Sequence, residues 1–139
     1  MKKILTKSFI IGTLICLATI VGGLIVYNKL PETVATHFTF RGTPNGYSSK
    51  AFAVFFVPVL LTAINFFIAL SMEFSEKEKY KTKLCKTVYT WLCPVLAVVI
   101  QTSVILYALG INITHVSLTI MSIYIIILIF SSIRKEDNK

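Results

Sequence analysis

The amino-acid sequence predicts an all-α membrane protein with four transmembrane helices. Three observations support this fold class: 55% of the 139 residues are hydrophobic, only 14% are charged, and the apolar residues gather in four long runs. A soluble domain carries about 25% charged residues. Because this composition cannot supply a polar surface, much of the surface must face lipid. The length fits one integral membrane domain over residues 1–139.

Each of the four runs is long enough, or nearly so, to cross a bilayer. Crossing about 30 Å of hydrocarbon at about 1.5 Å per residue takes roughly 20 apolar residues. The expected spans are residues 8–27, 51–71, 89–109 and 116–133, and none contains a charged side chain. The first run follows the basic start MKKILTK, but it lacks a clear small-residue cleavage site. We therefore expect a retained helix rather than a signal peptide.

The positive charges indicate the orientation of the spans. Of the 14 lysines and arginines, all but Lys29, Arg41 and Lys50 lie before span one, between spans two and three, or after span four. Cytoplasmic loops carry such an excess. The pattern predicts both termini in the cytosol and an extracellular loop at residues 28–50. A bias toward lysine and isoleucine favours a bacterial source, so the expected location is the bacterial cytoplasmic membrane.

Small and polar residues predict how the helices pack. Small side chains allow close approach between helices. They recur at helical spacing in span one at Gly12, Cys16, Thr19 and Gly23, and in span two at Thr62, Asn65 and Ala69. Gln101 and Tyr124 are the most polar residues near the middle of spans three and four, and we expect them to face the bundle interior.

Prolines and a capping pattern predict local features of the helices. Pro58 and Pro94 fall inside spans two and three, where the missing N–H should kink the helix. Ser75 followed by Glu78 forms a capping-box pattern, which predicts that the third helix begins near Glu76.

The sequence offers little chemistry for catalysis. The absence of ionisable residues in the spans counts against a proton-coupled exporter and an intramembrane metalloprotease. His37 and His115 have no carboxylate or cysteine at ligand spacing, so we expect no metal site. No phosphate loop or nucleophile elbow is present. We expect a protein that is not an enzyme and needs no cofactor. Nucleic acid is not an expected partner, because the net charge of +8 is divided among the loops.

The loop at residues 28–50 concentrates the distinctive residues. It is longer than a simple connection and carries too many apolar side chains to stay disordered. Pro31 followed by an acidic residue is typical of a helix start. Leu30, Val34, His37 and Phe38 recur at i, i+4, i+7 and i+8, which predicts a short helix on the membrane surface or on the bundle.

The second half of the loop predicts a turn and a helix cap. Thr43-Pro44-Asn45-Gly46 carries proline and glycine at the positions that a type I turn favours. Ser48 or Ser49 then stands where its hydroxyl can cap the second transmembrane helix.

The order of residues across this loop resembles the N-terminal membrane domain of SdpI-type immunity proteins, a domain of unknown function. The matching positions are Leu30, Pro31, His37, Phe38, Gly42, Pro44, Gly46, Tyr47, Ser49 and Lys50. The resemblance extends loosely to Trp91, Pro94 and Leu109-Gly110. Thr39 stands where that family has Asn, and Asn45 where it has Asp. The chain looks like a stand-alone short form of the domain.

The resemblance implies a membrane protein that protects its cell from a secreted killing factor, without enzymatic chemistry. The expected partners are the lipid bilayer and a secreted peptide or protein toxin. The expected binding residues are Pro31, His37, Phe38, Arg41, Gly42, Pro44, Asn45, Gly46 and Tyr47. A simpler interpretation of each is that it only folds the loop.

Two other functions fit the sequence. The first is a small structural or accessory subunit of a larger membrane complex, bound to another membrane protein or to a second copy of itself. The small-residue face of span one favours it. The second is a transporter of uncharged or lipid-like molecules.

Overall fold

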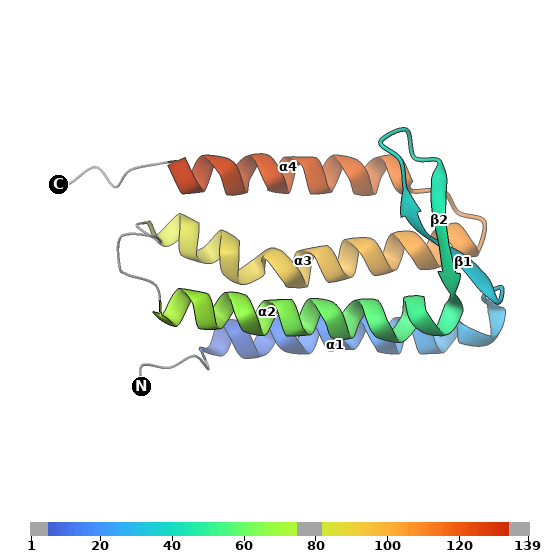
Figure 1. The fold of residues 1–139 in the computed structure, drawn as a ribbon, viewed down its shortest axis with the longest axis horizontal. Coiled ribbons are helices and arrows are strands. Elements are labelled where there is room, and N and C mark those ends of the chain that lie inside the picture. Colours follow the sequence, from blue (N-terminus) through green and yellow to red (C-terminus); the bar gives the residue numbers. More distant parts are fainter. Residues whose placement is uncertain (1–5, 75–81, 134–139) are drawn as a thin grey trace.

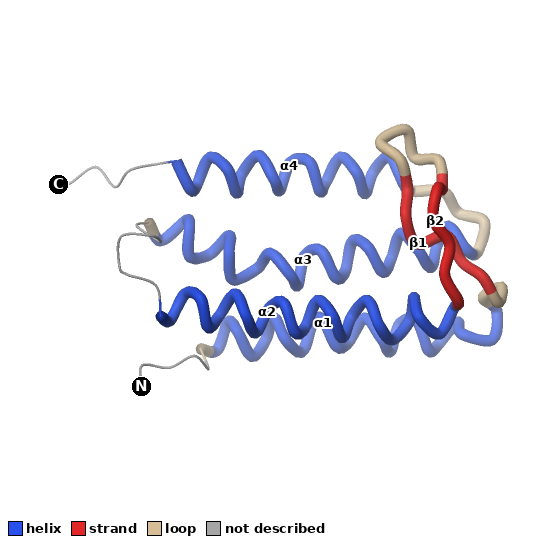
Figure 2. The backbone as a smooth tube through the Cα atoms, viewed as in Figure 1, coloured by secondary structure: helices blue, strands red, loops and turns tan. Residues whose placement is uncertain are grey.

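Four long helices lie side by side, and a β-hairpin covers one end of the bundle (Figures 1 and 2). The computed structural model describes residues 6–74 and 82–133. The helices are α1 (Lys7–Val26), α2 (Val57–Phe74), α3 (Lys83–Ala108) and α4 (Thr114–Ile133). A 3₁₀ turn, η1 (Tyr27–Lys29), extends α1, and a π-helical turn, η2 (Phe52–Phe56), leads into α2.

The four helices confirm the four predicted spans. With η1 and η2 included, each is long and apolar enough to cross a membrane. We therefore describe the chain as a multi-pass membrane protein. The start of α1 and the end of α4 both lie at the end of the bundle opposite the hairpin (Figure 1).

The third helix begins later than the sequence suggested. Thr82 has an extended backbone, with φ −112° and ψ 153°, and its hydroxyl accepts a hydrogen bond from the Cys85 N–H at 3.0 Å. Thr82 is thus the N-cap, and the predicted start near Glu76 is wrong. A threonine cap satisfies one of the free N–H groups of the first turn. The Ser75–Glu78 pattern lies outside the described residues.

Helix α1 packs against its neighbours through two glycines of the predicted small-residue face. A Cβ on Gly12 would lie 2.8 Å from Cγ of Pro94 on α3. A Cβ on Gly23 would lie 2.7 Å from Cγ1 of Val54 and 3.2 Å from Nε2 of Gln101. Both gaps are shorter than ordinary van der Waals contact, so only glycine permits this spacing between the helices.

The two transmembrane prolines are both fully buried but act differently. Pro94 lies inside α3, where its ring packs against Gly12, and Figure 1 shows a bend in this helix. Pro58 is the second residue of α2, and only Val57 separates it from η2. Because Pro58 cannot donate to the carbonyl of Val54, the preceding turn loses an α-helical hydrogen bond, and a π-helical turn occupies that position.

Polar side chains join the helices inside the bundle. Asn65 of α2 donates from Nδ2 to Thr13 Oγ1 of α1 at 3.2 Å. The Tyr124 hydroxyl of α4 donates to the Val88 carbonyl of α3 at 2.6 Å. Gln101 is 3% exposed, and its Nε2 has no partner among the described residues. Gln101 and Tyr124 therefore face the interior, as their sequence positions predicted.

The loop between α1 and α2 forms a β-hairpin, so the predicted short helix in this loop is wrong and the fold is not purely helical. Strand β1 (Thr33–Phe38) pairs antiparallel with β2 (Pro44–Ser49). The apolar spacing that suggested a helix also fits a strand, because Val34 and Phe38 share a face at period two. β-Branched residues at positions 33, 34 and 36 favour the extended form.

The tight turn of the hairpin also differs from its predicted position. The Gly42 N–H donates to the Thr39 carbonyl at 2.9 Å, which places the turn at residues 39–42. Pro44 instead begins β2, a position where a strand tolerates the missing N–H. The predicted cap of the second helical segment is confirmed, because Ser49 Oγ accepts from the Phe52 N–H at 3.2 Å.

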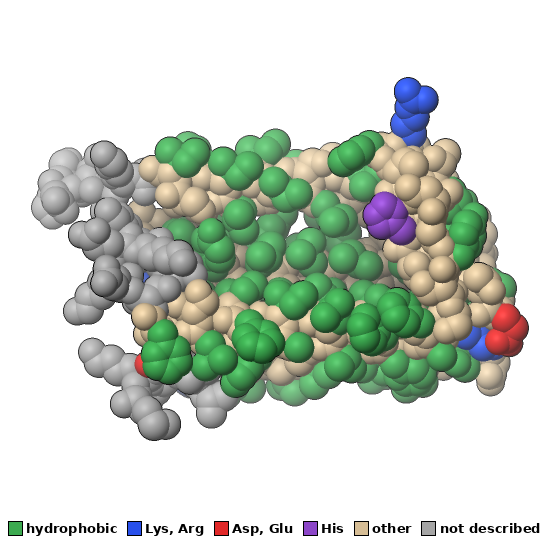
Figure 3. Space-filling model, in the orientation of Figure 1, with side chains coloured by type: hydrophobic (Ala, Val, Ile, Leu, Met, Phe, Trp, Pro, Cys, Tyr) green, Lys and Arg blue, Asp and Glu red, His purple; other side chains and the backbone are tan. Residues whose placement is uncertain are grey.

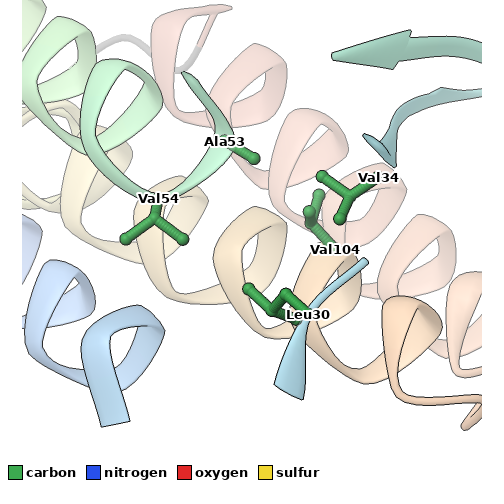
Figure 4. Packing of buried hydrophobic residues seen from close by; sticks show 5 residues of the cluster. All are labelled: Leu30, Val34, Ala53, Val54 and Val104. Carbon is green, nitrogen blue, oxygen red and sulfur yellow. The ribbon is translucent and has the colours of Figure 1, made fainter. Parts of the chain in front are cut away.

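A buried apolar cluster seats the hairpin on the bundle. Figure 4 shows Leu30 and Val34 beside Val54 and Val104. The cluster joins the hairpin side of the bundle to η2 and α3, and its members are Leu30, Val34, Ala53, Val54 and Val104. Val34 is only 2% exposed. Burying a valine side chain stabilises a fold by roughly 1.5–3 kcal/mol.

A pair of adjacent glycines tests the packing of α1. Gly23→Ala should lower the free energy of unfolding by about 1–3 kcal/mol, because the new methyl group overlaps Val54. Gly22→Ala is the matched control, since a Cβ there has nothing within 4 Å. Thermal unfolding in mild detergent, followed by circular dichroism, measures both. Equal melting temperatures for the two variants would contradict the close approach at Gly23.

Candidate functional site

The hairpin is held at its open end where it leaves α1 and enters η2. The Lys50 N–H donates to the Glu32 carbonyl at 3.0 Å, and Lys50 Nζ lies 2.8 Å from Glu32 Oε1. Lys50 Nζ also stands 5.0 Å from the centroid of the Tyr27 ring. The Glu32 side chain is 87% exposed, so the ion pair contributes at most about 1 kcal/mol.

At its other end the hairpin touches the beginning of α4. Gly42 is buried and has φ +75°, a conformation that glycine adopts without steric cost. Its carbonyl accepts a hydrogen bond from Thr114 Oγ1 at 3.3 Å. A Cβ on Gly42 would lie 2.6 Å from that hydroxyl and 3.3 Å from the His115 ring. The turn therefore rests directly on the first residues of α4.

The middle of the hairpin carries a polar pair on its exposed surface. His37 Nδ1 lies 2.5 Å from Asn45 Oδ1 across the two strands. Because the amide oxygen only accepts, Nδ1 carries the proton in this hydrogen bond. Gly46 stands opposite His37, and a Cβ there would lie 2.8 Å from His37 Cβ. The missing side chain at Gly46 thus leaves room for the imidazole.

An aromatic contact fixes the strand against α3. The rings of Phe38 and Tyr107 meet edge to face, with centroids 5.0 Å apart and an interplanar angle of 73°. Such a pair contributes about 0.5–1.5 kcal/mol beyond the area it buries. Phe38 is therefore partly buried support for the hairpin rather than a free contact residue.

A pocket of about 230 Å³ lies beneath β1, between α3 and α4. In Figure 3 this flank of the molecule is mostly hydrophobic, with openings between α4 and α3 beside the hairpin. We call the pocket of about 230 Å³ the hairpin pocket. Its lining residues are Thr36, His37, Phe38, Ile100, Ser103, Val104, Thr114, Ser117, Leu118 and Met121.

The hydroxyl groups in this pocket bond to the protein itself. Ser103 Oγ donates to the Val99 carbonyl at 2.7 Å and lies within hydrogen-bond distance of Ser117 Oγ. Ser117 Oγ reaches the Ile113 carbonyl at 3.2 Å. Thr114 Oγ1 bonds to Asn112 Oδ1 at 2.7 Å, and Thr36 Oγ1 to Ser48 Oγ at 3.1 Å.

The structure brings three of the nine predicted site residues together. His37, Asn45 and Gly46 form one cluster, while Gly42 and Phe38 instead anchor the hairpin to α4 and α3. Pro31 precedes β1 at the open end of the hairpin, six residues from His37, so about 20 Å of extended chain separates them. The remaining predicted residues differ in exposure: Arg41 and Tyr47 are exposed, and Pro44 is half-buried.

Sequence reasoning missed the residues of α3 and α4 that line the pocket. Ser103 and Ser117 are buried and face each other across the two helices. Small hydroxyl residues inside apolar helices often mark helix contacts, and this signal was available in the sequence. Neither histidine takes part in a metal cluster, because the described residues hold no group of three histidine, cysteine or acidic side chains.

Comparison with known proteins identifies one region of similarity. Residues 14–62 match a protein family described as a domain of unknown function (DUF1648). The match runs from within α1 through the hairpin to the first turns of α2. It is therefore centred on the hairpin. No curated protein and no solved structure matches the chain.

A second pair of glycines tests the contact between the turn and α4. Both Gly42 and Gly110 have positive φ, but a Cβ on Gly110 has nothing within 4 Å. Each change to alanine costs about 1–2 kcal/mol in backbone strain. Only Gly42→Ala should also push the turn from Thr114. We expect faster hydrogen–deuterium exchange at residues 39–43 in Gly42→Ala and unchanged exchange there in Gly110→Ala. Unchanged protection in both variants would contradict the docking of the turn on α4.

Proposed function

We propose that this chain is a bacterial membrane immunity or toxin-response protein, which protects its cell from a secreted killing factor without enzymatic chemistry. The observation that carries the proposal is the ordered hairpin, fixed at Lys50, Phe38 and Gly42, over the end of a membrane-spanning bundle. A connection with no binding role could be much shorter, as residues 109–113 between α3 and α4 demonstrate.

The match over residues 14–62 covers the hairpin and the two helical segments beside it, and the matched family is described as a domain of unknown function. The order of residues there also resembles SdpI-type immunity proteins. In this proposal the hairpin faces the outside of the cytoplasmic membrane, as the excess of lysine and arginine on the opposite side favours.

The contact surface that we propose is the exposed side of the hairpin. His37 and Asn45 offer a polar pair, Arg41 offers a cation at the turn, and Tyr47 offers a ring that is 61% exposed. Phe40 beside Arg41 is 98% exposed. Aromatic and arginine side chains dominate the energetics of protein contacts. This combination suits an amphipathic peptide or protein toxin that arrives at the membrane surface.

A second candidate function is an accessory subunit of a larger membrane complex. The observation that favours it is the exposure of α4, which makes its main contact with α3. Only 11% of the most apolar 18-residue stretch of α4 is buried inside the protein, against 33% of the corresponding stretch of α3. A membrane protein that co-purifies in constant ratio with the chain, together with unchanged survival under toxin challenge, would favour this function over immunity.

Survival assays test the immunity proposal. A sensitive host that expresses the wild-type chain should survive the culture fluid of a strain that kills it. His37→Ala and Asn45→Ala should each reduce protection by roughly tenfold in dose, since a good interface contact is worth about 1–2 kcal/mol.

Thr33→Ala is the control in this assay, because Thr33 is exposed on the same strand at its far end. Membrane levels of each variant are measured by immunoblot. The proposed role of the hairpin would be contradicted if the wild type gave no protection. It would also be contradicted if all variants protected equally at equal expression.

Reporter fusions test the orientation. Alkaline phosphatase, which is active only outside the cytosol, should be active when it is fused after Thr43 and inactive when it is fused after Lys79. The reason is the excess of positive charge on the Lys79 side of the membrane. The reverse pattern would place the hairpin in the cytosol and rule out direct contact with a secreted factor.

A further inference from the structure

The hairpin pocket lies at the depth of lipid chains. Helix α4 has 20 residues, so it is about 30 Å long, which is about the thickness of the hydrocarbon layer. Its first residue, Thr114, must therefore stand close to the boundary of that layer. Ser117 and Met121, which line the pocket, are about 4 Å and 10 Å further along the helix. The pocket thus lies within the hydrocarbon leaflet on the hairpin side.

The lining of the pocket favours an apolar occupant. Its serine and threonine hydroxyls all have protein partners, namely backbone carbonyls, Asn112, Ser48 or each other. An ordered water needs two to four polar partners, and apolar cavities stay dry. The rest of the lining is His37, which bonds to Asn45, and apolar side chains that include Ile100, Val104 and Leu118. A dry cavity of about 150 Å³ already binds benzene, so about 230 Å³ can hold a segment of hydrocarbon chain.

The pocket opens on a face that lipid covers. Figure 3 shows openings on the flank of the bundle, between α4 and α3 beside the hairpin. Residues of α4 near it are lipid-facing, with Val116 60% exposed and Ile120 43% exposed. A hydrocarbon chain therefore reaches the pocket from the side without crossing water.

We propose that the hairpin pocket binds one acyl chain of a membrane phospholipid, drawn from the leaflet on the hairpin side. Thr36 and Phe38 of β1 close the pocket at its membrane-surface end, and Ile100 and Met121 line its deeper part. His37 also lines the pocket, and its Nδ1 bonds to Asn45. The bound chain fills the space between α3 and α4 that the protein leaves empty. The pocket shares His37 with the contact surface proposed above, while its other lining residues lie outside that surface.

Photo-crosslinking tests the proposal. The wild-type chain is reconstituted in vesicles of phosphatidylethanolamine and phosphatidylglycerol. These vesicles contain a little phosphatidylcholine with a diazirine in the upper half of one acyl chain. The protein is then extracted in mild detergent, freed of unbound lipid and irradiated. Because the surrounding lipid has been removed, only a lipid whose acyl chain is retained in the protein can react. Peptide mass spectrometry should find adducts at Ile100, Val104 and Leu118 and none at Ile123 or Ile126.

Two matched variants on α4 separate the pocket from the lipid face. Leu118→Trp fills the pocket and should abolish the adducts, while Ile120→Trp lies outside the lining and should leave them unchanged. Circular dichroism confirms that both variants fold. The wild-type experiment alone tests whether the pocket retains an acyl chain, even if Leu118→Trp misfolds. Adducts spread equally over pocket and lipid-facing residues would overturn the proposal. A complete lack of adducts in the wild type would also overturn it, and would leave an apolar side chain of a protein partner as the occupant.

Discussion

The close approach at Gly23 is the contact on which the rest of the structure depends. Val54 can pack directly on α1 because Gly23 has no side chain. Val54 then joins Leu30, Val34 and Val104 in the cluster that carries the hairpin. The position of the hairpin, and of the pocket below it, therefore depends on the absence of one methyl group in the last turn of α1. Tight packing transmits such local geometry, since packed interiors have few voids to absorb a displacement.

The helical part of the fold could be predicted from the sequence because its cause is local. A run of about 20 apolar residues must satisfy its backbone hydrogen bonds internally in lipid, and a helix does so without help from distant residues. The small-residue face at Gly12 and Gly23 and the inward-facing Gln101 and Tyr124 follow from the same local reasoning. The start of α3 was missed because two capping signals compete there, and the threonine at position 82 caps the helix.

The hairpin could not be predicted in the same way because a strand depends on its partner. Leu30, Val34 and Phe38 fit a helical stripe as well as a strand, and only pairing with residues 44–49 decides between them. That partner segment begins with proline and contains Gly46, so it has weak strand propensity of its own. The pocket was hidden for a related reason. Ser103 and Ser117 belong to different helices, and their proximity depends on how α3 and α4 meet.

The two ends of the hairpin return to one point, since the Lys50 N–H bonds to the Glu32 carbonyl just beyond the last strand pair. This closure therefore brings the two ends of the hairpin together whatever the length of the strands. Substitutions at the exposed positions of the hairpin therefore leave the joint between the hairpin and the bundle intact.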